Sequence, residues 1–437
     1  MSDREQDLAN ARERLLDASL AEVFGRPGAS PAAAPSTRRS WLGAAVALLG
    51  IGVVAVTLWW SSGRTPHQAG EREVQDPAPI PKPKACTSVE QMLALDVDAP
   101  SLLLVLDDPT DLAHVERFRA LRQLIVLNPR GEGAAWQKVD EHPDALRPIG
   151  TLTTLEVLQL PAEMKLTAPH LRSLAGAERL RSLALPGRTV VDAEAAAALT
   201  GLPALRELRI HQATIGSGFL EALAPLRLTH LELNGCPVSA ATVYRELAKL
   251  PTVGHLAVRF MTGYSEKTPA LGEHAFAAFE QMPALVDLDL DESNFDDRFM
   301  RRLPQGLQRL RLGHHVMTPS TIADLKRLAD LEELIFHHAT HYQAVVDLLG
   351  ALRLKAVFLH GWLDQRVLEA IARHPSLERV TLRLRGRDSL EPLRRAHKLR
   401  SLQLRFDRGV PLVDDPDESL LQALRDNGVD VSFDREN

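Results

Sequence analysis

The sequence repeats one short pattern of leucines along most of its length, and this repetition limits the folds that the chain can adopt. Residues 226–250 (LRLTHLELNGCPVSAATVYRELAKL) show the pattern once. Apolar residues alternate through Leu231 and Leu233 as in a strand, and then recur at helical spacing through Val243 and Leu247. One such unit cannot bury its own apolar face, so copies must stack on one another and share a continuous core.

Twelve copies align on the first apolar residue of a Leu-x-Leu core. These anchor residues are Leu124, Leu158, Leu183, Leu208, Leu231, Leu256, Leu288, Leu310, Leu334, Val357, Val380 and Leu402. Successive anchors lie 34, 25, 25, 23, 25, 32, 22, 24, 23, 23 and 22 residues apart, so nine of the eleven intervals fall between 22 and 25. This regularity predicts a solenoid over residues 99–433, in which each unit adds one parallel strand and one helix.

The repeat resembles the leucine-rich repeat family, whose units run roughly 20–29 residues. Fuller LxxLxxLxL copies begin at Leu152, Leu202 and Leu328, and Leu231-x-Leu233-x-x-Cys236 matches the family's core most closely. Many units lack the Asn or Cys after the strand, which affects the helical subtype and not the repeat. The resemblance implies an α/β fold, a curved parallel sheet with helices on its convex side and an extended concave surface for binding.

Before the repeats, residues 41–60 (WLGAAVALLGIGVVAVTLWW) form an uncharged stretch of 20 residues. That is about the length that crosses a bilayer as a helix. Trp41 at one end and Trp59-Trp60 at the other are typical of residues at membrane interfaces. A cleaved signal peptide is the alternative, but its apolar region is usually shorter, roughly 7–15 residues. We therefore predict an uncleaved signal anchor, which makes the chain a single-pass membrane protein.

The segments on either side of the predicted span are polar. Residues 1–40 form a short lead in which 1–25 include an amphipathic helical pattern; this part could dock a cytosolic partner or be an inert tail. Residues 61–85 are Pro-rich and read as a semi-rigid linker. Three basic residues lie within twenty positions before the span and two after it, which favours a cytosolic N-terminus and an extracytoplasmic repeat domain at 86–437.

The repeat domain is expected to have a cap at each end. Helical spacing after Cys86 and an atypical strand near Leu102 predict the first cap, and a helix with a strand over 420–433 predicts the last. Cys86 and Cys236 lie several units apart, so a disulfide between them is not expected. Cys236 is predicted as a packed core thiol, whereas Cys86 could form an intermolecular link.

Two anchor intervals are long and contain aromatic residues. Trp136 lies in a Gly/Pro-rich excursion and Tyr264 in a second insertion. Insertions in solenoids project as loops, and exposed aromatic residues in loops often anchor partners. The alternative is that each aromatic side chain packs against the rim of the solenoid.

Strand alternation sends the leucines to the core and their neighbours to the concave face. The predicted ligand-binding residues on that face are Arg209, His211, His230, Glu232, Asp287, Asp289, Asp291, Arg309, Arg311, His337, Phe358 and His360. The centre of this site is the acidic strand 287–291 beside the two arginines of strand 309–311. These charges could recognise a partner, or they could neutralise one another across adjacent strands, where each exposed pair contributes only about 0–1 kcal/mol.

Motifs for catalysis and for cofactors are absent from the sequence. It has no GxxxxGK[ST], GxGxxG, HExxH or GxSxG. His337 and His360 occupy equivalent positions and could hold a metal with a third ligand, but no tight ligand spacing supports this. A net charge of −6 over 437 residues argues against nonspecific nucleic-acid binding. We therefore expect no enzyme, no cofactor, no metal and no nucleic-acid partner.

Together these patterns predict a membrane-anchored leucine-rich repeat protein whose concave face binds a protein or surface polymer without catalysis. One alternative is a transmembrane signalling component that couples external binding to a cytosolic partner through residues 1–25. A weaker alternative is an enzyme that acts on a glycan through the acidic and histidine-rich centre. The Ala-, Arg- and Leu-rich composition without an Asn-x-Ser/Thr sequon is typical of a bacterial chain.

Overall fold

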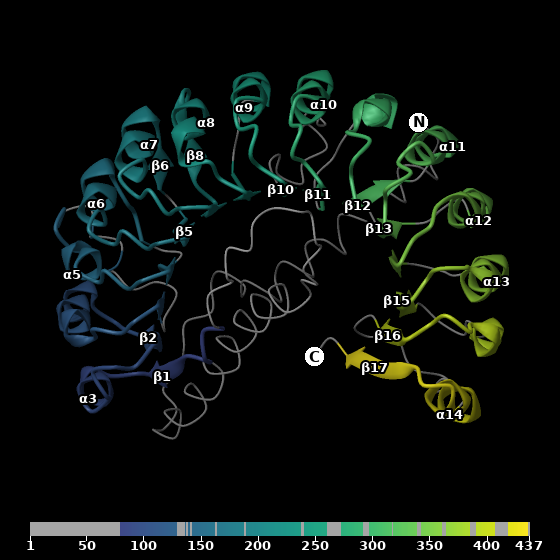
Figure 1. The fold of residues 1–437 in the computed structure, drawn as a ribbon, viewed down its shortest axis with the longest axis horizontal. Helices are drawn as coiled ribbons and strands as arrows, with labels where there is room; N and C mark the ends of the chain where they lie inside the picture. Colours follow the sequence, from purple (N-terminus) through teal and green to yellow (C-terminus); the bar gives the residue numbers. More distant parts are fainter. Residues whose placement is uncertain are drawn as a thin grey trace, which may run out of the picture. The chain divides into compact units, whose positions relative to one another are not determined.

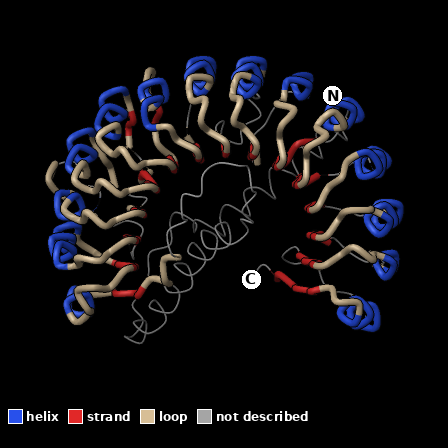
Figure 2. The backbone as a smooth tube through the Cα atoms, in the orientation of Figure 1, coloured by secondary structure: helices blue, strands red, loops and turns tan. Residues whose placement is uncertain are grey.

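The structure is a computed structural model, and the described residues are 79–128, 136, 139, 142–161, 164–187, 189–236, 240–259, 272–291, 297–316, 318–338, 342–360, 364–384, 390–406 and 418–435. The chain divides into two units, Met1–Glu73 and Val74–Asn437. All described residues belong to the second unit. Within it, strands line the inner side of an arc and helices line the outer side (Figures 1 and 2).

The inner layer is one parallel sheet of 15 strands, which follow one another in chain order apart from β6 and β8. The strands are β1 (Lys84–Cys86), β2 (Ser101–Val105), β3 (Gln123–Leu127), β4 (Val157–Gln159), β5 (Ser182–Leu185), β7 (Glu207–His211), β9 (His230–Asn234), β10 (His255–Arg259), β11 (Asp287–Asp289), β12 (Arg309–Val316), β13 (Glu333–His338), β14 (Ala356–His360), β15 (Arg379–Leu384), β16 (Ser401–Phe406) and β17 (Asp430–Arg435). Strands β6 (Val190–Val191) and β8 (Thr214–Ile215) form a separate parallel pair.

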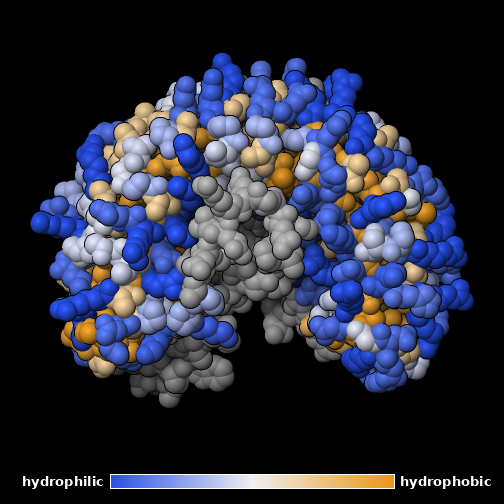
Figure 3. All heavy atoms as spheres, viewed as in Figure 1, coloured by the Kyte–Doolittle hydropathy of each residue, from blue (hydrophilic) through white to orange (hydrophobic). Residues whose placement is uncertain are grey.

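The outer layer consists of short α-helices and 3₁₀ helices, about one for each strand. The α-helices are α3 (Val89–Leu93), α5 (Arg147–Gly150), α6 (Ala168–Ser173), α7 (Ala193–Leu199), α8 (Phe219–Ala222), α9 (Ala240–Leu247), α10 (Glu273–Glu280), α11 (Pro319–Leu325), α12 (Tyr342–Ala351), α13 (Gln365–Arg373) and α14 (Glu418–Asp426). The 3₁₀ helices are η1 (Pro109–Arg117), η3 (Ala224–Leu226), η4 (Asp297–Arg302) and η5 (Glu391–Arg395). Hydrophilic side chains cover much of this layer (Figure 3).

The sheet register confirms the predicted alignment of the repeats. Each anchor residue is the register partner of the anchor in the next unit, from Leu124 and Leu158 to Val380 and Leu402. The series extends to Leu102 on β2. All twelve anchors are buried. Stacked in register, they build the continuous core that a single unit cannot form, so the fold is a leucine-rich repeat solenoid.

The N-terminal end of the solenoid differs from one expectation. Strand β1 begins at Lys84, inside the segment predicted as linker, and pairs with β2. Cys86 ends this strand, and its side chain is buried in the core. Burial also raises the pKa of the Cys86 thiol. The intermolecular link that Cys86 could have formed is therefore wrong, because the thiol faces the core and is not accessible to a second chain.

For Trp136, the structure favours the packed alternative over an exposed loop anchor. Its side chain is fully buried in the hydrophobic core, and Nε1 donates a hydrogen bond of 2.9 Å to the carbonyl oxygen of Leu106. The excursion after β3 thus returns its aromatic residue to the core. Burial removes the apolar ring from water, and the hydrogen bond satisfies the polar N–H group of the indole. The second predicted aromatic anchor, Tyr264, lies outside the described residues.

Among the described residues, no helix is both long and apolar enough to span a bilayer. The predicted membrane span at residues 41–60 lies outside the described residues, as do residues 1–25 and most of the predicted linker.

Gly150 marks a place where two neighbouring units approach closely. A Cβ atom at Gly150 would lie 1.9 Å from the carbonyl oxygen of Ser173. We expect Gly150→Ala to lower the free energy of unfolding by about 1–3 kcal/mol, because the methyl group forces the units apart. Urea denaturation of the full-length chain in detergent micelles, followed by circular dichroism, measures this loss.

Gly201→Ala is the matched control for this substitution. A Cβ atom at Gly201 would lie 3.2 Å from the nearest atom, the carbonyl oxygen of Ala198, so only a small adjustment is needed. The control is therefore expected to cost less than Gly150→Ala. Equal losses for the two variants would show that close approach at Gly150 does not limit stability.

Candidate functional site

The predicted site residues come from strands β7 to β14, and the sheet register sets their spacing. Arg209, Glu232, Ala257, Asp289 and Arg311 are register partners on five consecutive strands. Neighbouring strands lie about 4.8 Å apart, so the long charged side chains of this row reach one another directly. The regular repeat therefore arranges charged residues from distant parts of the sequence in one line.

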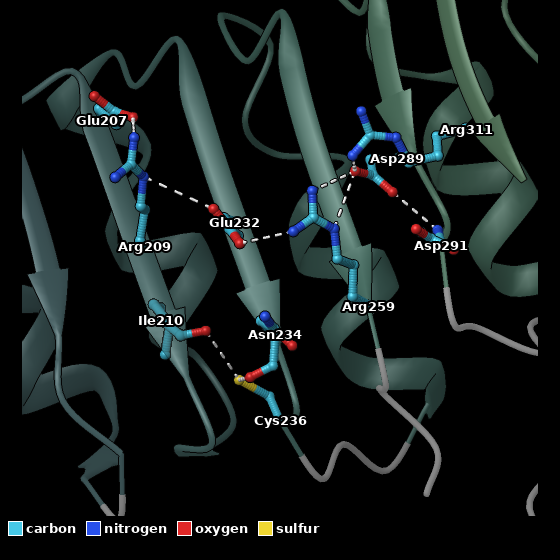
Figure 4. A network of polar contacts seen from close by, with 10 residues as sticks. All are labelled: Glu207, Arg209, Ile210, Glu232, Asn234, Cys236, Arg259, Asp289, Asp291 and Arg311. Atoms are coloured by element: carbon cyan, nitrogen blue, oxygen red, sulfur yellow. Dashed lines mark hydrogen bonds and ion pairs between the residues drawn. The ribbon is translucent and has the colours of Figure 1, made fainter. Parts of the chain in front are cut away.

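Five strands contribute to a series of alternating acids and arginines, which we call the concave network (Figure 4). Its members are Glu207, Arg209, Glu232, Arg259, Asp289 and Arg311. Glu232 connects two arginines: its carboxylate lies 3.7 Å from Nε of Arg209 and 3.3 Å from Nη1 of Arg259. Each acid in the concave network therefore contacts at least one guanidinium group.

Asp289 lies at the centre of the concave network and is only 4% exposed. Its Oδ2 accepts hydrogen bonds of 3.0 Å from Nε of Arg259 and 3.0 Å from Nη1 of Arg311. Its Oδ1 accepts a hydrogen bond of 2.9 Å from the backbone N–H of Asp291. Burial acts to raise the pKa of Asp289, but Arg311 and Arg259 outweigh that effect, so the pKa lies below its ordinary value.

The expectation that Asp289 is exposed on the concave face is thus wrong. Alternation points Asp289 to the correct face, but arginines from the strands on both sides cover it. The register partner of Asp289 on β10 is Ala257, whose small side chain leaves room for Arg259 to reach across. Burial acts to lower the pKa of Arg259, but the Asp289 carboxylate outweighs it and the pKa is raised.

Arg259 was not among the predicted site residues, although it stands on the concave side of its strand. The signal lay in the aligned repeats: Arg259 is two residues beyond Ala257, which makes it the diagonal neighbour of Asp289. Such diagonal pairs lie roughly 7–8 Å apart at the backbone, within reach of a long side chain. A comparison of direct register partners on adjacent strands does not reveal this diagonal pair.

A second cluster lies at the start of the same strands. The rings of His230 and His255 stack with their centroids 4.0 Å apart and 3° between their planes. Nδ1 of His255 lies 3.1 Å from Oδ2 of Asp287 and 3.1 Å from Nη2 of Arg309. Nε of Arg309 lies 2.9 Å from the same Asp287 oxygen. The predicted residues His230, Asp287 and Arg309 thus belong to one local group, with His255 between them.

The remaining predicted residues fall into three groups. Burial lowers the pKa of His211, against the opposing effect of Glu232. Phe358 lies on β14, three strands beyond Asp289, and Cζ of Arg405 lies 5.4 Å from its ring centroid. The side chains of His337 and His360 are not among those that the structure describes. The structure therefore joins the acids and arginines of β7–β12 but places Phe358 in a separate contact.

Beneath the concave network, Cys236 is a core residue, as the sequence indicates. Its Sγ lies 3.5 Å from the carbonyl oxygen of Ile210 and 3.6 Å from that of Asn234. Burial raises the pKa of the thiol to about 11, so the sulfur stays protonated near neutral pH. Cys236 packs behind the strand and does not contribute chemistry to the concave face.

Over strands β7 to β12, the concave face is a surface of fixed charges. No group of three or more His, Cys, Asp or Glu residues among the described side chains is arranged to hold a metal ion. Asp289 is held ionised between two arginines, so it can accept hydrogen bonds but has no proton to donate. This chemistry suits recognition of a partner with complementary charges.

Chains similar to this one occur among solved structures. A scan against protein-family models finds no match, and a search of curated proteins finds none. Among solved structures, the chain is similar to TLR13 in a complex with ssRNA13, with 16% identity, a TM-score of 0.45, and coverage of 79% of this chain and 51% of that one. It is also similar to an internalin (inlF) from Listeria monocytogenes strain 4b F2365, with 15% identity, a TM-score of 0.39, and coverage of 66% and 82%.

The chain spans about half the length of the TLR13 chain that it matches. The fold and the concave network define the class: a solenoid of the leucine-rich repeat type with a charged concave face.

Proposed function

We propose that this chain is a non-catalytic binding protein that recognises a protein or surface polymer through its concave face. The observation that carries the proposal is the concave network, in which the charged side chains hold one another in place. A binding surface whose side chains are already ordered loses less entropy on association, about 0.5–1.5 kcal/mol for each long side chain that need not be immobilised. The concave network supplies such preorganisation over five strands.

The residues that contact the partner are, in this proposal, the more exposed charges beside the buried centre. The Arg309 side chain is 35% exposed and the Arg379 side chain is 53% exposed. Arg379 on β15 contacts Glu333 on β13 at 3.3 Å, so the charged surface extends three strands beyond Arg309 on β12. Asp289 has a different role, because its buried carboxylate positions Arg259 and Arg311 and does not itself contact the partner.

A pull-down with charge reversals tests this function. We expect the double variant Arg309→Glu, Arg379→Glu to retain at least about tenfold less of the partner that co-purifies with the full-length chain from its own cells. The substitutions turn attraction between opposite charges into repulsion between like charges. The retained proteins and glycans are quantified by mass spectrometry.

The matched control is Arg366→Glu, Arg373→Glu on helix α13, at the outer side of the solenoid. These side chains are 59% and 74% exposed, and the control changes the net charge by the same amount. It should retain the partner. Loss of the partner from both double variants would point to nonspecific electrostatic capture, and retention by both would contradict binding through the concave face.

We also propose that residues 41–60 anchor the protein in a membrane with the repeat domain outside the cytoplasm. The support is the 20-residue uncharged stretch with tryptophans at both ends. Protease treatment of intact cells should digest or release the repeat domain and leave the N-terminal segment with the membrane fraction. A repeat domain that stays protected until the cells are lysed would contradict this topology.

A further inference from the structure

The charges of the repeat domain are divided unequally between its two flanks. All strands of the large sheet are parallel, so the segments that join a helix to the next strand lie on one flank. From residue 118 to residue 429 these helix-to-strand segments contain 13 Lys and Arg residues but five Asp and Glu residues, a net charge of +8. We call this surface the basic flank. The segment before β2, in the N-terminal cap, carries only acids, so the basic flank begins at the next unit.

The opposite flank has the reverse balance of charge. As far as the structure describes them, the strand-to-helix segments from β2 to β16 carry one lysine and six aspartates. Part of this difference follows from the helix macrodipole, which favours bases in the last turn of a helix and acids in the first. That effect fades within one turn, whereas Arg181 lies eight residues past the end of α6 and Arg206 seven past the end of α7. The helix ends therefore do not account for all the bases of the basic flank.

Exposed bases without an ion pair occur along the whole basic flank. Three of its acids, Glu156, Glu332 and Glu378, each pair with one of its bases. By contrast, six exposed bases from six different units form no ion pair within the described part of the chain: Arg119, Arg181, Arg227, Lys249, Arg353 and Lys398. Positive charge thus remains available to an anionic partner from one end of the flank to the other.

The bases of the basic flank follow one another around the arc of the solenoid. The backbone N–H of Arg206 donates to the carbonyl oxygen of Arg181 at 2.9 Å, and the N–H of Thr229 donates to that of Arg206 at 2.8 Å. Such ladder contacts place successive units about 4.8 Å apart on this side of the domain. The flank therefore runs along the arc of Figures 1 and 2. A single small anion would meet only one or two of these bases, whereas an extended anionic surface would meet many.

A membrane surface with anionic lipid headgroups fits this arrangement. Each Lys or Arg near such a surface is attracted to it, and the attraction adds up over all bases within a Debye length. Exposed Phe, Tyr and Trp side chains, on which single-stranded nucleic acids stack, are missing from the described helix-to-strand segments. The proposed anchor also keeps a membrane close, because the 23 residues from 61 to 83 span at most about 80 Å when fully extended.

We infer that the basic flank rests on the surface of the membrane that holds the proposed anchor, with its exposed arginines and lysines against anionic lipid headgroups. This inference rests on the proposed anchoring of residues 41–60 and adds an orientation to it. The strands run roughly perpendicular to the membrane, and the aspartates of the opposite flank point away from it. Neither the concave face nor the outer layer of helices is covered, so the concave face stays open to its partner.

Quenching of a fluorophore by lipid headgroups tests this orientation. Cys86 and Cys236 are both buried, so a cysteine introduced at an exposed site can be labelled selectively. Gln305→Cys places the label on the basic flank, between η4 and β12, and Gln343→Cys places it on the opposite flank, at the start of α12. The labelled full-length chain is reconstituted into vesicles of phosphatidylcholine, alone or with about 30% phosphatidylglycerol. Both kinds of vesicle contain phosphatidylcholine with a nitroxide on its headgroup as the short-range quencher.

In the anionic vesicles we expect quenching at position 305 to be at least about threefold stronger than at position 343, because only the basic flank meets the headgroups. The difference should disappear in vesicles of phosphatidylcholine alone. It should also disappear at about 0.5 M salt, which screens the attraction between the bases and the headgroups.

Charge reversals test whether the bases of the flank cause the contact. In the chain labelled at position 305, Arg181→Glu, Arg353→Glu should weaken quenching in anionic vesicles at least about threefold. The matched control is Arg147→Glu, Arg366→Glu, in the first turns of α5 and α13 on the opposite flank, with the same change in net charge. It should keep the quenching of the unaltered chain. Circular dichroism verifies that each variant is folded.

Three outcomes would overturn the inference. They are equal quenching at positions 305 and 343, quenching that does not respond to lipid charge, and equal losses in the two double variants. Binding of a duplex DNA oligonucleotide through Arg181 and Arg353, without a response to anionic lipid, would assign a nucleic-acid partner instead.

Flotation with vesicles of phosphatidylcholine alone is the separate readout for the anchor. A chain that floats with these vesicles but shows no charge-dependent quenching would reject only the orientation and leave the proposed anchor standing. A chain that does not float would reject the anchor and the orientation together.

Discussion

Replacing Asp289 with alanine is expected to lower the free energy of unfolding by about 3–5 kcal/mol, the range found when one partner of a buried ion pair is removed. The Asp289 carboxylate is almost fully buried and accepts hydrogen bonds from Arg259 and Arg311. Without it, the guanidinium groups of Arg259 and Arg311, on the two strands that flank β11, repel each other with no acid between them. Urea denaturation of the full-length chain in detergent micelles measures the loss.

Asp287→Ala is the matched control for Asp289→Ala. Asp287 is also an acid on β11, but its side chain is 19% exposed and contacts Arg309, which is 35% exposed. Solvent screens this pair, so we expect a loss of about 1 kcal/mol or less. Similar losses for the two variants would show that burial between arginines does not distinguish Asp289.

The response to acid provides a second readout for Asp289. Because the folded state lowers its pKa, the stabilisation is present above the ordinary aspartate pKa and is lost as pH falls through the folded-state pKa. In Asp289→Ala that part of the acid-induced loss should be missing. An unchanged slope of stability against pH below pH ~4 would contradict the assigned pKa direction.

Replacing Trp136 with alanine is expected to cost about 3–5 kcal/mol, because the substitution leaves a large cavity in the core. Trp136 is fully buried, and its Nε1 donates to the carbonyl oxygen of Leu106 at 2.9 Å. Because solenoid units contact only their neighbours, the loss should concentrate around β2 and β3. Hydrogen exchange with mass spectrometry locates the destabilised units, and urea denaturation measures the total loss in the free energy of unfolding.

Trp136→Phe separates the two contributions of the indole. Phenylalanine keeps most of the apolar ring but cannot donate to Leu106, so a smaller loss of about 1–3 kcal/mol is expected. A loss below about 1 kcal/mol for Trp136→Ala would mean that the side chain is exposed in solution. It would favour the other interpretation of the sequence, a loop aromatic that anchors a partner.

The sequence was sufficient to predict the fold because one physical rule is applied many times. Every anchor from Leu124 to Leu402 is a register partner of the next, since only that alignment buries the leucines of all units together. The terminal strand containing Val431 and the helix before it were predicted for the same reason. The start of β1 at Lys84 was not, because three residues after a Pro-rich segment carry too little periodicity.

The contacts and burial of the site residues were less predictable than the side of the sheet on which they lie. Alternation correctly assigns Arg209, Glu232 and Arg311 to the concave side, because it depends on the backbone alone. Burial of Asp289 depends on a diagonal arginine and on the small side chain of Ala257, which a strand-by-strand comparison does not reveal. The position of Trp136 stayed open for a similar reason: the interval shows an insertion, but not where its aromatic residue packs.

Photo-crosslinking from two positions in one repeat unit tests the central claim most directly. A photoreactive phenylalanine analogue replaces Ile335 on β13, at the concave face, or Gln343 on α12, at the outer side. In the full-length chain in its own cells, position 335 should yield a covalent adduct with the partner and position 343 should not. Adducts formed only from position 343, or equally from both, would contradict recognition through the concave face.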